Sequence, residues 1–321
     1  MSSSPQSHAP LGPPELHEVS DGVFAYIQPD GTWWINNMGV LVGKKHTVAV
    51  DSTSTVARTR AFKDAIAGLT GNPVHTLINT HHHGDHTNGN FLFDTATIVA
   101  HERCRDAILA DGKEGIKRLQ SAGIFVNPDG GPDWGDIEPA PPFLTYTEGV
   151  NVFVDDLRCE VSYAGTPAHT TNDSVIWLPE RKLLFAGDLV FNGGTPFLLM
   201  GSVAGALEAV ASLKRFGAET IVPGHGPVAG PGLIDDVLDY LTFVMELAKK
   251  GHADGVHPLE LARGTDLGKF AELSDSERIV GNLHRAYFEL DGAERGAEID
   301  GVRVLQDMMT YNGGQPLTCL A

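Results

Sequence analysis

Four histidines and one aspartate occupy six consecutive positions, and this segment constrains the chain more than any other. It reads HHHGDH over residues 81–86. The preceding residues 74–80 have the apolar and β-branched composition of a short buried strand, whereas the glycines and asparagines of residues 84–90 are typical of a loop. The side chains therefore gather where a strand ends and the chain turns. Neutral imidazoles and a carboxylate suit zinc, and they also suit iron or manganese.

A single loop cannot surround a metal ion with all five of these groups, so further ligands are expected elsewhere in the chain. Three later segments supply candidates at the ends of apolar strand patterns, each beside a glycine or a proline: His169, Asp188 and His225. Loops at strand ends are where a rigid sheet presents functional side chains. The sequence thus predicts one metal site that is assembled from four separate places.

Strand and helix patterns alternate in two consecutive halves of the chain. The first half predicts strands near residues 22–28, 38–42, 47–50, 74–80 and 97–100, with a helix at about 56–69. The second half predicts strands near residues 151–154, 158–163, 174–178, 182–186 and 220–223, with a helix at about 203–216. Two sheets packed face to face, with helices on the outside, satisfy this order of elements.

The remaining segments complete the expected domain organisation. Residues 1–15 are rich in serine and proline, without the apolar stretch of a secretory signal, and are expected to form a disordered tail. Residues 16–230 would form the main domain, in which the glycine- and proline-rich residues 111–147 are expected to be a long irregular, lid-like insertion. Residues 231–321 read as a helical C-terminal region that either covers the cleft or serves a homodimer.

Charge and cysteine content narrow the function. The chain has 23 lysines and arginines against 41 aspartates and glutamates, a formal net charge of −18. Such an acidic chain argues against a nucleic-acid partner and against docking on an anionic membrane, and no apolar run is long enough to span a bilayer. The three cysteines are too few and too scattered for a disulfide framework. A cytoplasmic protein with a small-molecule substrate is the expectation.

The four motifs together, in this order, resemble the metallo-β-lactamase superfamily, whose first motif has the form H-x-H-x-D-H. The resemblance covers roughly residues 20–230. It implies an α/β fold, an αβ/βα four-layer sandwich with a two-metal site at one edge, here followed by a helical C-terminal extension. By position, the ligands of the first ion would be His81, His83 and His169, those of the second Asp85, His86 and His225, and Asp188 would bridge both. His82 would point away from the ions.

The resemblance is to particular branches of this superfamily. An aspartate at position 188 fits the glyoxalase-II-like ligand set, whereas the β-lactamases have a cysteine or a serine there, so β-lactam hydrolysis would be weak at most. Residues 168–174, 187–196 and 281–287 are most similar to the SoxH-like metallo-hydrolases. The resemblance to that group does not identify a substrate.

The function implied is that of a dinuclear metal-dependent hydrolase. Its cofactors would be two divalent ions, Zn²⁺ in the first place, with iron or manganese as alternatives. A hydroxide bridging the ions would attack the activated carbonyl of an ester, thioester, lactone or amide, and Asp85 and Asp188 would hold it and carry its proton. Two other functions stay open: an iron-dependent redox or non-hydrolytic enzyme on the same fold, and a catalytically silent binding protein.

Substrate contacts are expected from four further residues. Trp33 and Trp34 lie in a hairpin-like stretch that would flank the cleft as an aromatic flap over an apolar group, with ordinary core packing as the alternative. Asn192 and His284 are the other candidates. His252 and His257, in contrast, are expected to be ordinary surface or hydrogen-bonded residues.

Overall fold

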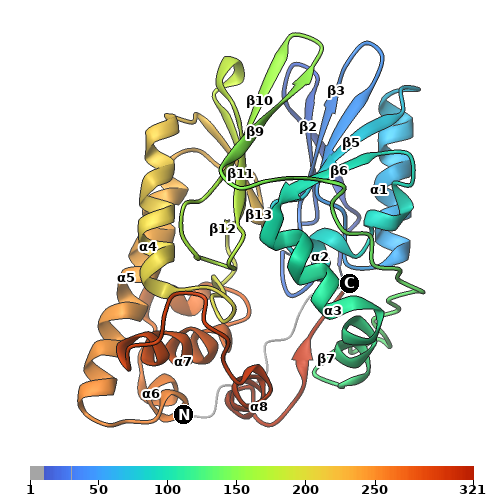
Figure 1. Cartoon of the computed structure of the whole chain (residues 1–321). Helices are drawn as coiled ribbons and strands as arrows, with labels where there is room; N and C mark the ends of the chain where they lie inside the picture. The colour runs from blue at the N-terminus through green and yellow to red at the C-terminus, as the bar shows by residue number, and fades with distance from the viewer. Residues whose placement is uncertain (1–10, 30) are drawn as a thin grey trace.

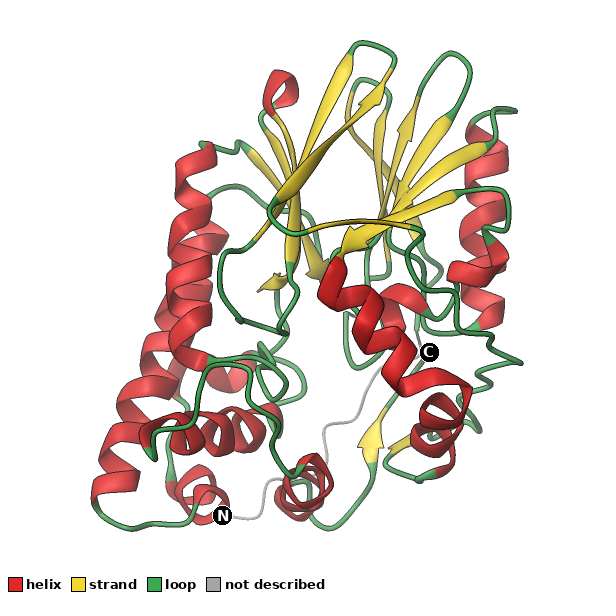
Figure 2. Cartoon of the chain, in the orientation of Figure 1, coloured by secondary structure: helices red, strands yellow, loops and turns green. Residues whose placement is uncertain are grey.

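Two mixed sheets face each other, and helices cover their outer faces (Figure 2). The computed structural model describes residues 11–29 and 31–321. Residues 1–10 of the tail expected at 1–15 therefore lie outside the described residues, and the first strand already begins at Glu15. The expected four-layer sandwich followed by helices is confirmed.

The first sheet holds seven strands in the order β1-β2-β3-β4-β5-β6-β8. Their bounds are β1 (Glu15–Ser20), β2 (Val23–Ile27), β3 (Met38–Val42), β4 (Thr47–Val50), β5 (Val74–Ile78), β6 (Thr97–His101) and β8 (Leu144–Tyr146). Strands β1 to β4 pair antiparallel, whereas β4, β5, β6 and β8 pair parallel. The carboxyl ends of the parallel strands consequently meet at one edge, where α/β sheets bind ligands.

The second sheet holds five strands in the order β13-β12-β11-β10-β9. Their bounds are β9 (Gly149–Val154), β10 (Leu157–Tyr163), β11 (Ser174–Leu178), β12 (Leu183–Phe191) and β13 (Thr220–His225). Strands β12 and β13 run parallel, and every residue of β12 is buried. A strand buried on both faces needs an apolar sequence, and β12 is apolar except at Gly187 and Asp188.

Alternation along the strands divides the core between the layers. Val48 and Val50 of β4 belong to the cluster between the two sheets, while Ala49 faces outward toward α1 (Val56–Leu69). Phe62 and Ile66 of α1 meet that outward face, because residues four apart lie on one side of a helix. Full burial of such a side chain contributes about 1.5–3 kcal/mol.

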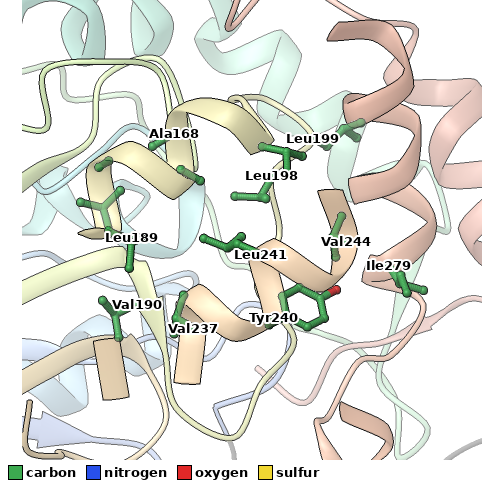
Figure 3. Close-up of a cluster of buried hydrophobic side chains, with 14 of the residues drawn as sticks. Ala168, Leu189, Val190, Leu198, Leu199, Val237, Tyr240, Leu241, Val244 and Ile279 are labelled. Atoms are coloured by element: carbon green, nitrogen blue, oxygen red, sulfur yellow. The ribbon is translucent and has the colours of Figure 1, made fainter. Parts of the chain in front are cut away.

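The outer face of the second sheet packs against α4 (Val203–Ser212) and α5 (Gly232–Ala253). Figure 3 shows Leu189 and Val190 of β12 facing Val237 and Leu241 of α5. The same cluster continues into the C-terminal helices α6 (Pro258–Gly264), α7 (Arg278–Leu290) and α8 (Gly301–Tyr311), which lie below the sheets in Figure 1. The C-terminal region is thus continuous with the core of the second sheet.

The segment expected to be irregular over residues 111–147 is in part regular, so that prediction was wrong for both of its ends. Helix α3 (Glu102–Ser121) continues to residue 121, with a break at Gly112, where φ is +53°. Residues 113–121 are mostly strong helix formers, which explains the continuation. Strand β7 (Phe125–Val126) follows and pairs parallel with β14 (Leu317–Thr318) near the chain's end, and β8 joins the first sheet. Only the stretch between β7 and β8 is irregular.

Short elements complete the description. The helix α2 (Gly84–Thr87) follows β5, and four single 3₁₀ turns cover Asn90–Leu92, Pro179–Arg181, Leu213–Phe216 and Gly268–Glu272. All three cysteines are buried and free. Within residues 11–29 and 31–321, the helices are too short or too polar to cross a bilayer.

Candidate metal centre

The predicted ligands converge at the edge where the parallel strands of both sheets end. The histidine segment leaves β5 and turns into α2, His169 lies between β10 and β11, and His225 ends β13. Asp188 lies inside β12, where the pairing with β13 shifts register on both sides of Gly187. An irregularity of this kind changes the direction in which the neighbouring side chains point. A Cβ atom on Gly224 would lie 1.9 Å from the Asp188 Oδ1 atom, so only glycine fits beside this carboxylate.

Four of the side chains form a first cluster: His81, His83, His169 and Asp188. The Nε2 atom of His169 lies 2.8 Å from His83 Nδ1 and 3.2 Å from Asp188 Oδ2. His81 Nε2 lies 3.9 Å from the same carboxylate oxygen. All ligand atoms of the cluster are within 4.8 Å of one another.

A second cluster adjoins the first: Asp85, His86, Asp188 and His225. His225 Nε2 lies 3.2 Å from both Asp85 Oδ2 and Asp188 Oδ2. His86 Nε2 lies 3.1 Å from Asp188 Oδ1 and 3.7 Å from Asp85 Oδ2. Asp188 therefore belongs to both clusters, as a bridging ligand would.

Among residues 11–29 and 31–321, three buried ligand atoms of the two clusters have no well-aligned hydrogen-bond partner: His81 Nε2, His86 Nε2 and Asp188 Oδ1, the last two in spite of their 3.1 Å separation. Buried polar atoms nearly always have a partner, so three orphans at one place point to a missing group. Imidazole nitrogens and carboxylate oxygens are zinc ligands. The two clusters together fit a dinuclear metal site.

In the metal-free centre, the pKa values of His81 and His83 are lowered, whereas those of His86 and His225 are raised. Burial lowers the pKa values of His81 and His83 well below the usual range, and neighbouring imidazoles add to this. Burial would also lower the pKa of His86 and His225, but nearby carboxylates outweigh it, and the pKa of His225 rises to about 9. A bound cation would replace the protons of these two imidazoles.

The pKa values of the two carboxylates in the centre, Asp85 and Asp188, are lowered. Burial would raise the pKa values of Asp85 and Asp188, but the surrounding imidazoles outweigh it and hold both pKa values well below the usual range. Both side chains consequently stay ionised at neutral pH. Ionised carboxylates are the form that binds a metal ion.

A buried carboxylate behind the ligands orients them. Asp51 Oδ2 lies 2.8 Å from His86 Nδ1 and accepts the Thr80 hydroxyl hydrogen at 2.8 Å, while Oδ1 accepts the Thr80 backbone N–H at 2.8 Å. Thr80 Oγ1 in turn lies 3.0 Å from His81 Nδ1. Such partners fix the tautomer and the ring orientation of ligating histidines. Asp51 also holds a left-handed φ of +58°, a strained conformation of the kind found at functional sites.

Sequence reasoning missed this role of Asp51, because the residue reads as the start of a helix cap. One sequence signal could have indicated this role. Asp51 directly follows the buried strand β4, and the next strand, β5, leads to the histidine segment. His82 belongs to neither cluster. Its Nδ1 atom accepts a hydrogen bond from Asn172 Nδ2 at 2.9 Å, and burial lowers its pKa to about 4.

A cavity of about 200 Å³ opens from the centre, and its walls are mostly apolar. The side toward the two clusters is formed by His82, His83, Gly84, Asp85, His169, Asp188 and His225. The other walls come from distant parts of the chain: Trp33, Trp34, Asp111, Leu119, Phe125, Phe191, Phe197, Leu199, Met200, Arg278 and Leu305. Residues 111–147 and the C-terminal region were expected near the cleft, but the individual residues of α3, β7 and α8 were not predicted, since their approach depends on the packing of the C-terminal region.

The two tryptophans line the cavity and also pack in the core, so their role as a flap over a substrate stays a prediction. Trp33 is 8% exposed, and its Nε1–H donates to Glu277 Oε1 at 2.7 Å, so it is a core residue that also faces the cavity. The Arg278 guanidinium covers its ring, 4.1 Å from the centroid. Trp34 is partly buried and packs edge to face against Phe125 and Trp134, at centroid distances of 5.4 and 4.8 Å.

Asn192 and His284 lie outside this cavity, contrary to expectation. The Asn192 side chain donates to the Pro227 carbonyl at 2.7 Å and lines a different hollow, beside α5. The His284 side chain leaves α7 toward α8, with its Nε2 atom 2.8 Å from Asp307 Oδ2. The turn after β12 and the helical face of α7 direct both side chains away from the metal centre.

The fold and the paired clusters define an α/β protein with a candidate dinuclear metal site at the sheet edge. The sequence profile of the metallo-beta-lactamase superfamily matches residues 31–225, more than half of the chain. The protein belongs to this superfamily.

Individual relatives are distant. The chain is 27% identical to the 2,4-dinitroanisole O-demethylase subunit alpha of Nocardioides sp. (strain JS1661), over 55% of this chain and 44% of that protein. It is 24% identical to the acyl-coenzyme A thioesterase MBLAC2 of Bos taurus, over 61% of this chain and 78% of the thioesterase. A metallo-beta-lactamase structure from Pontibacter korlensis superimposes with a TM-score of 0.56 at 20% identity, covering 72% of this chain and 99% of that one. The chain thus matches less than half of the demethylase subunit's length.

Proposed function

We propose that the protein is a dinuclear metal-dependent hydrolase that attacks the activated carbonyl of a small, partly apolar substrate. An ester, a thioester, a lactone or an amide is the substrate class. The observation that carries this proposal is the pair of ligand clusters that share Asp188 and open into one cavity. The seven ligands are His81, His83, Asp85, His86, His169, Asp188 and His225.

Bound divalent ions would supply a water that ionises near neutral pH and would polarise the substrate's carbonyl oxygen. The chain's own residues set the conditions for this chemistry. The Asp85 and Asp188 carboxylates stay ionised and face the cavity, so they can orient the attacking water and accept its proton. Asp51 keeps the His86 ring in place. The surrounding aromatic side chains limit access of bulk water to the reacting atoms.

The cavity supports a substrate with an aromatic or aliphatic portion. Trp33, Trp34, Phe125 and Phe197 present ring faces and edges to it, and flat or apolar groups bind well to such walls. The relatives include a protein named for thioester cleavage and one named for removal of a methyl group from an aromatic ether. Acyl thioesters and aryl esters are therefore the first substrates to test, with aryl methyl ethers beside them.

Zinc is the proposed metal, and the ligand set also accepts iron or manganese. Metal analysis of the purified protein, together with an absorbance scan, separates hydrolysis from iron-dependent redox chemistry. Zinc without a visible absorption band supports the hydrolase. Failure to bind any metal would instead favour a catalytically silent binding protein.

Turnover of a substrate panel by the zinc-loaded protein tests the proposed reaction. The panel holds esters, thioesters, lactones and amides with short and aromatic acyl groups. Asp188→Ala is expected to abolish turnover, whereas Asp156→Ala, which changes an exposed aspartate in the turn between β9 and β10, is expected to leave it unchanged. Equal rates for Asp188→Ala and the unmutated protein would refute the proposed mechanism.

A further inference from the structure

Away from the metal centre, three side chains with metal-binding chemistry meet on the C-terminal helices. His257 precedes α6, His284 lies in α7 and Asp307 lies in α8. His284 Nε2 lies 2.8 Å from Asp307 Oδ2, and His257 Nε2 lies 3.9 Å from the same oxygen. One ligand atom from each residue lies within 4.8 Å of the other two. Three elements that are separate in sequence thus present one convergent group.

The spacing of this group is close to that around a tetrahedral ion. Ligand atoms about 2.0–2.2 Å from a zinc ion are roughly 3.3–3.6 Å from one another. The distances of 2.8 and 3.9 Å to Asp307 lie on either side of that range. The candidate dinuclear centre shows the same spread, from 2.8 Å between His169 and His83 to 3.9 Å between His81 and Asp188. Small side-chain rotations would bring the three ligands to a common ion.

The chemistry and the exposure of the group also suit a cation. Two imidazoles with one carboxylate form a ligand set that zinc uses in proteins. The side chains of His257, His284 and Asp307 are 44%, 13% and 20% exposed, which leaves a side open for a water molecule as fourth ligand.

We propose that His257, His284 and Asp307 form a third cation site, of the zinc type, separate from the dinuclear centre. An ion there links α6, α7 and α8, which already pack against one another. Helices α7 and α8 also carry Arg278 and Leu305, which line the substrate cavity. Occupation of the third site therefore holds one wall of that cavity in place.

Two features make this site weaker than the dinuclear centre. His257 Nδ1 accepts a hydrogen bond from the Leu259 N–H at 3.3 Å, and binding through Nε2 moves a proton to Nδ1 and ends that bond. Arg303, one turn before Asp307 on α8, adds positive charge near His284. Zinc is consequently expected to fill the dinuclear centre first.

Zinc titration of the full chain tests the proposal. The protein is stripped of metal, titrated with ZnCl₂ in a calorimeter, and dialysed against zinc buffers so that bound zinc can be counted by mass spectrometry. His257→Asn removes the imidazole but keeps a side-chain acceptor for the start of α6. Asp307→Asn keeps an acceptor for His284. His252→Ala is the matched control, because His252 pairs with Asp291 at 2.7 Å without a third ligand among the described residues.

Three zinc equivalents are expected for the unmutated chain, with the third the weakest. His257→Asn and Asp307→Asn should each weaken the third equivalent at least about tenfold and leave the first two unchanged, and His252→Ala should change none. Unchanged binding of all equivalents in the first two variants would overturn the proposal, as would only two equivalents in the unmutated chain. The third site can also be tested separately from the dinuclear centre. A zinc equivalent that is lost in His257→Asn but kept in Asp188→Ala would support the third site, even if the proposed dinuclear centre were refuted.

Discussion

Asp51→Asn tests the contribution of a side chain that is not a candidate ligand itself. Asp51 contacts one candidate ligand, His86, and the neighbouring Thr80. Asp51 is 2% exposed and makes three contacts of 2.8 Å with these two residues. Asparagine tolerates the left-handed φ of +58° better than other replacements, so the backbone should be preserved. The amide oxygen can still accept the Thr80 backbone N–H.

The substitution acts on the tautomer of His86. A His86 ring that binds metal through Nε2 carries its proton on Nδ1 and donates it to the Asp51 carboxylate. An amide NH₂ group at that position instead favours a proton on Nε2, which blocks the metal. Loss of such a partner typically weakens metal binding 10–100-fold, or about 1.4–2.8 kcal/mol. We expect this loss for the ion held by Asp85, His86 and His225.

Zinc affinity, measured by calorimetry and by competition with a chelator, gives the result directly. Asp275→Asn is the matched control, because Asp275 is also 2% exposed with φ +54°, but it pairs with Arg278 rather than with a metal ligand. The control should keep its zinc affinity. If Asp51→Asn bound both ions within threefold of the unmutated chain, with its melting temperature unchanged, the orienting role of Asp51 would be refuted.

Four further outcomes are expected. Removal of both zinc ions with a chelator should end turnover and lower the melting temperature by about 8 °C, since two ions, each at 100 times its Kd, add about 5.4 kcal/mol and unfolding entropy is about 2.1 cal/mol/K per residue; an unchanged melting curve would count against it. Gly224→Ala should weaken zinc binding at least about tenfold, because the new Cβ would lie 1.9 Å from Asp188 Oδ1, whereas Gly230→Ala, with 3.9 Å of clearance, should not. Trp34→Ala should raise KM for aromatic esters about tenfold and leave acetyl esters near their original KM, as kinetics on both would show. Zinc affinity should rise with pH up to about 9, because below that pH His225 carries a proton that the metal must displace; a flat dependence of Kd between pH 6 and 8 would contradict this.

The sequence predicts the metal ligands better than it predicts the cavity. His81, His169, Asp188 and His225 each follow or lie in an apolar strand, and local patterns place strand ends well. Helix α1 also occupies the expected residues 56–69; the glycine and proline of residues 71–73 mark its end, whereas its cap is Thr55 rather than the preceding residues 51–54 that the sequence suggests.

Other features depend on contacts that no local pattern records. Strands β8 and β14 have only three and two residues, too few for alternation to identify them. Leu119, Phe125 and Leu305 come together around the cavity from α3, β7 and α8, and β7 is held there by its pairing with β14. The importance of Asp51 follows from the parallel pairing of β4 with β5, which brings it beside Thr80.

The pairing of β14 with β7 has a consequence for how the cavity beside the candidate metal centre can diversify. Backbone bonds from Leu317 to the Ile124 carbonyl at 2.7 Å and from Cys319 to the Val126 carbonyl at 3.0 Å hold Phe125 against both cavity tryptophans. Residues 317–319 thus help to shape the cavity proposed to bind the substrate. The candidate ligands of the dinuclear centre, in contrast, all lie within residues 81–225. Selection can therefore alter which molecules are accepted through changes near the end of the chain, without disturbing the inherited ligand set.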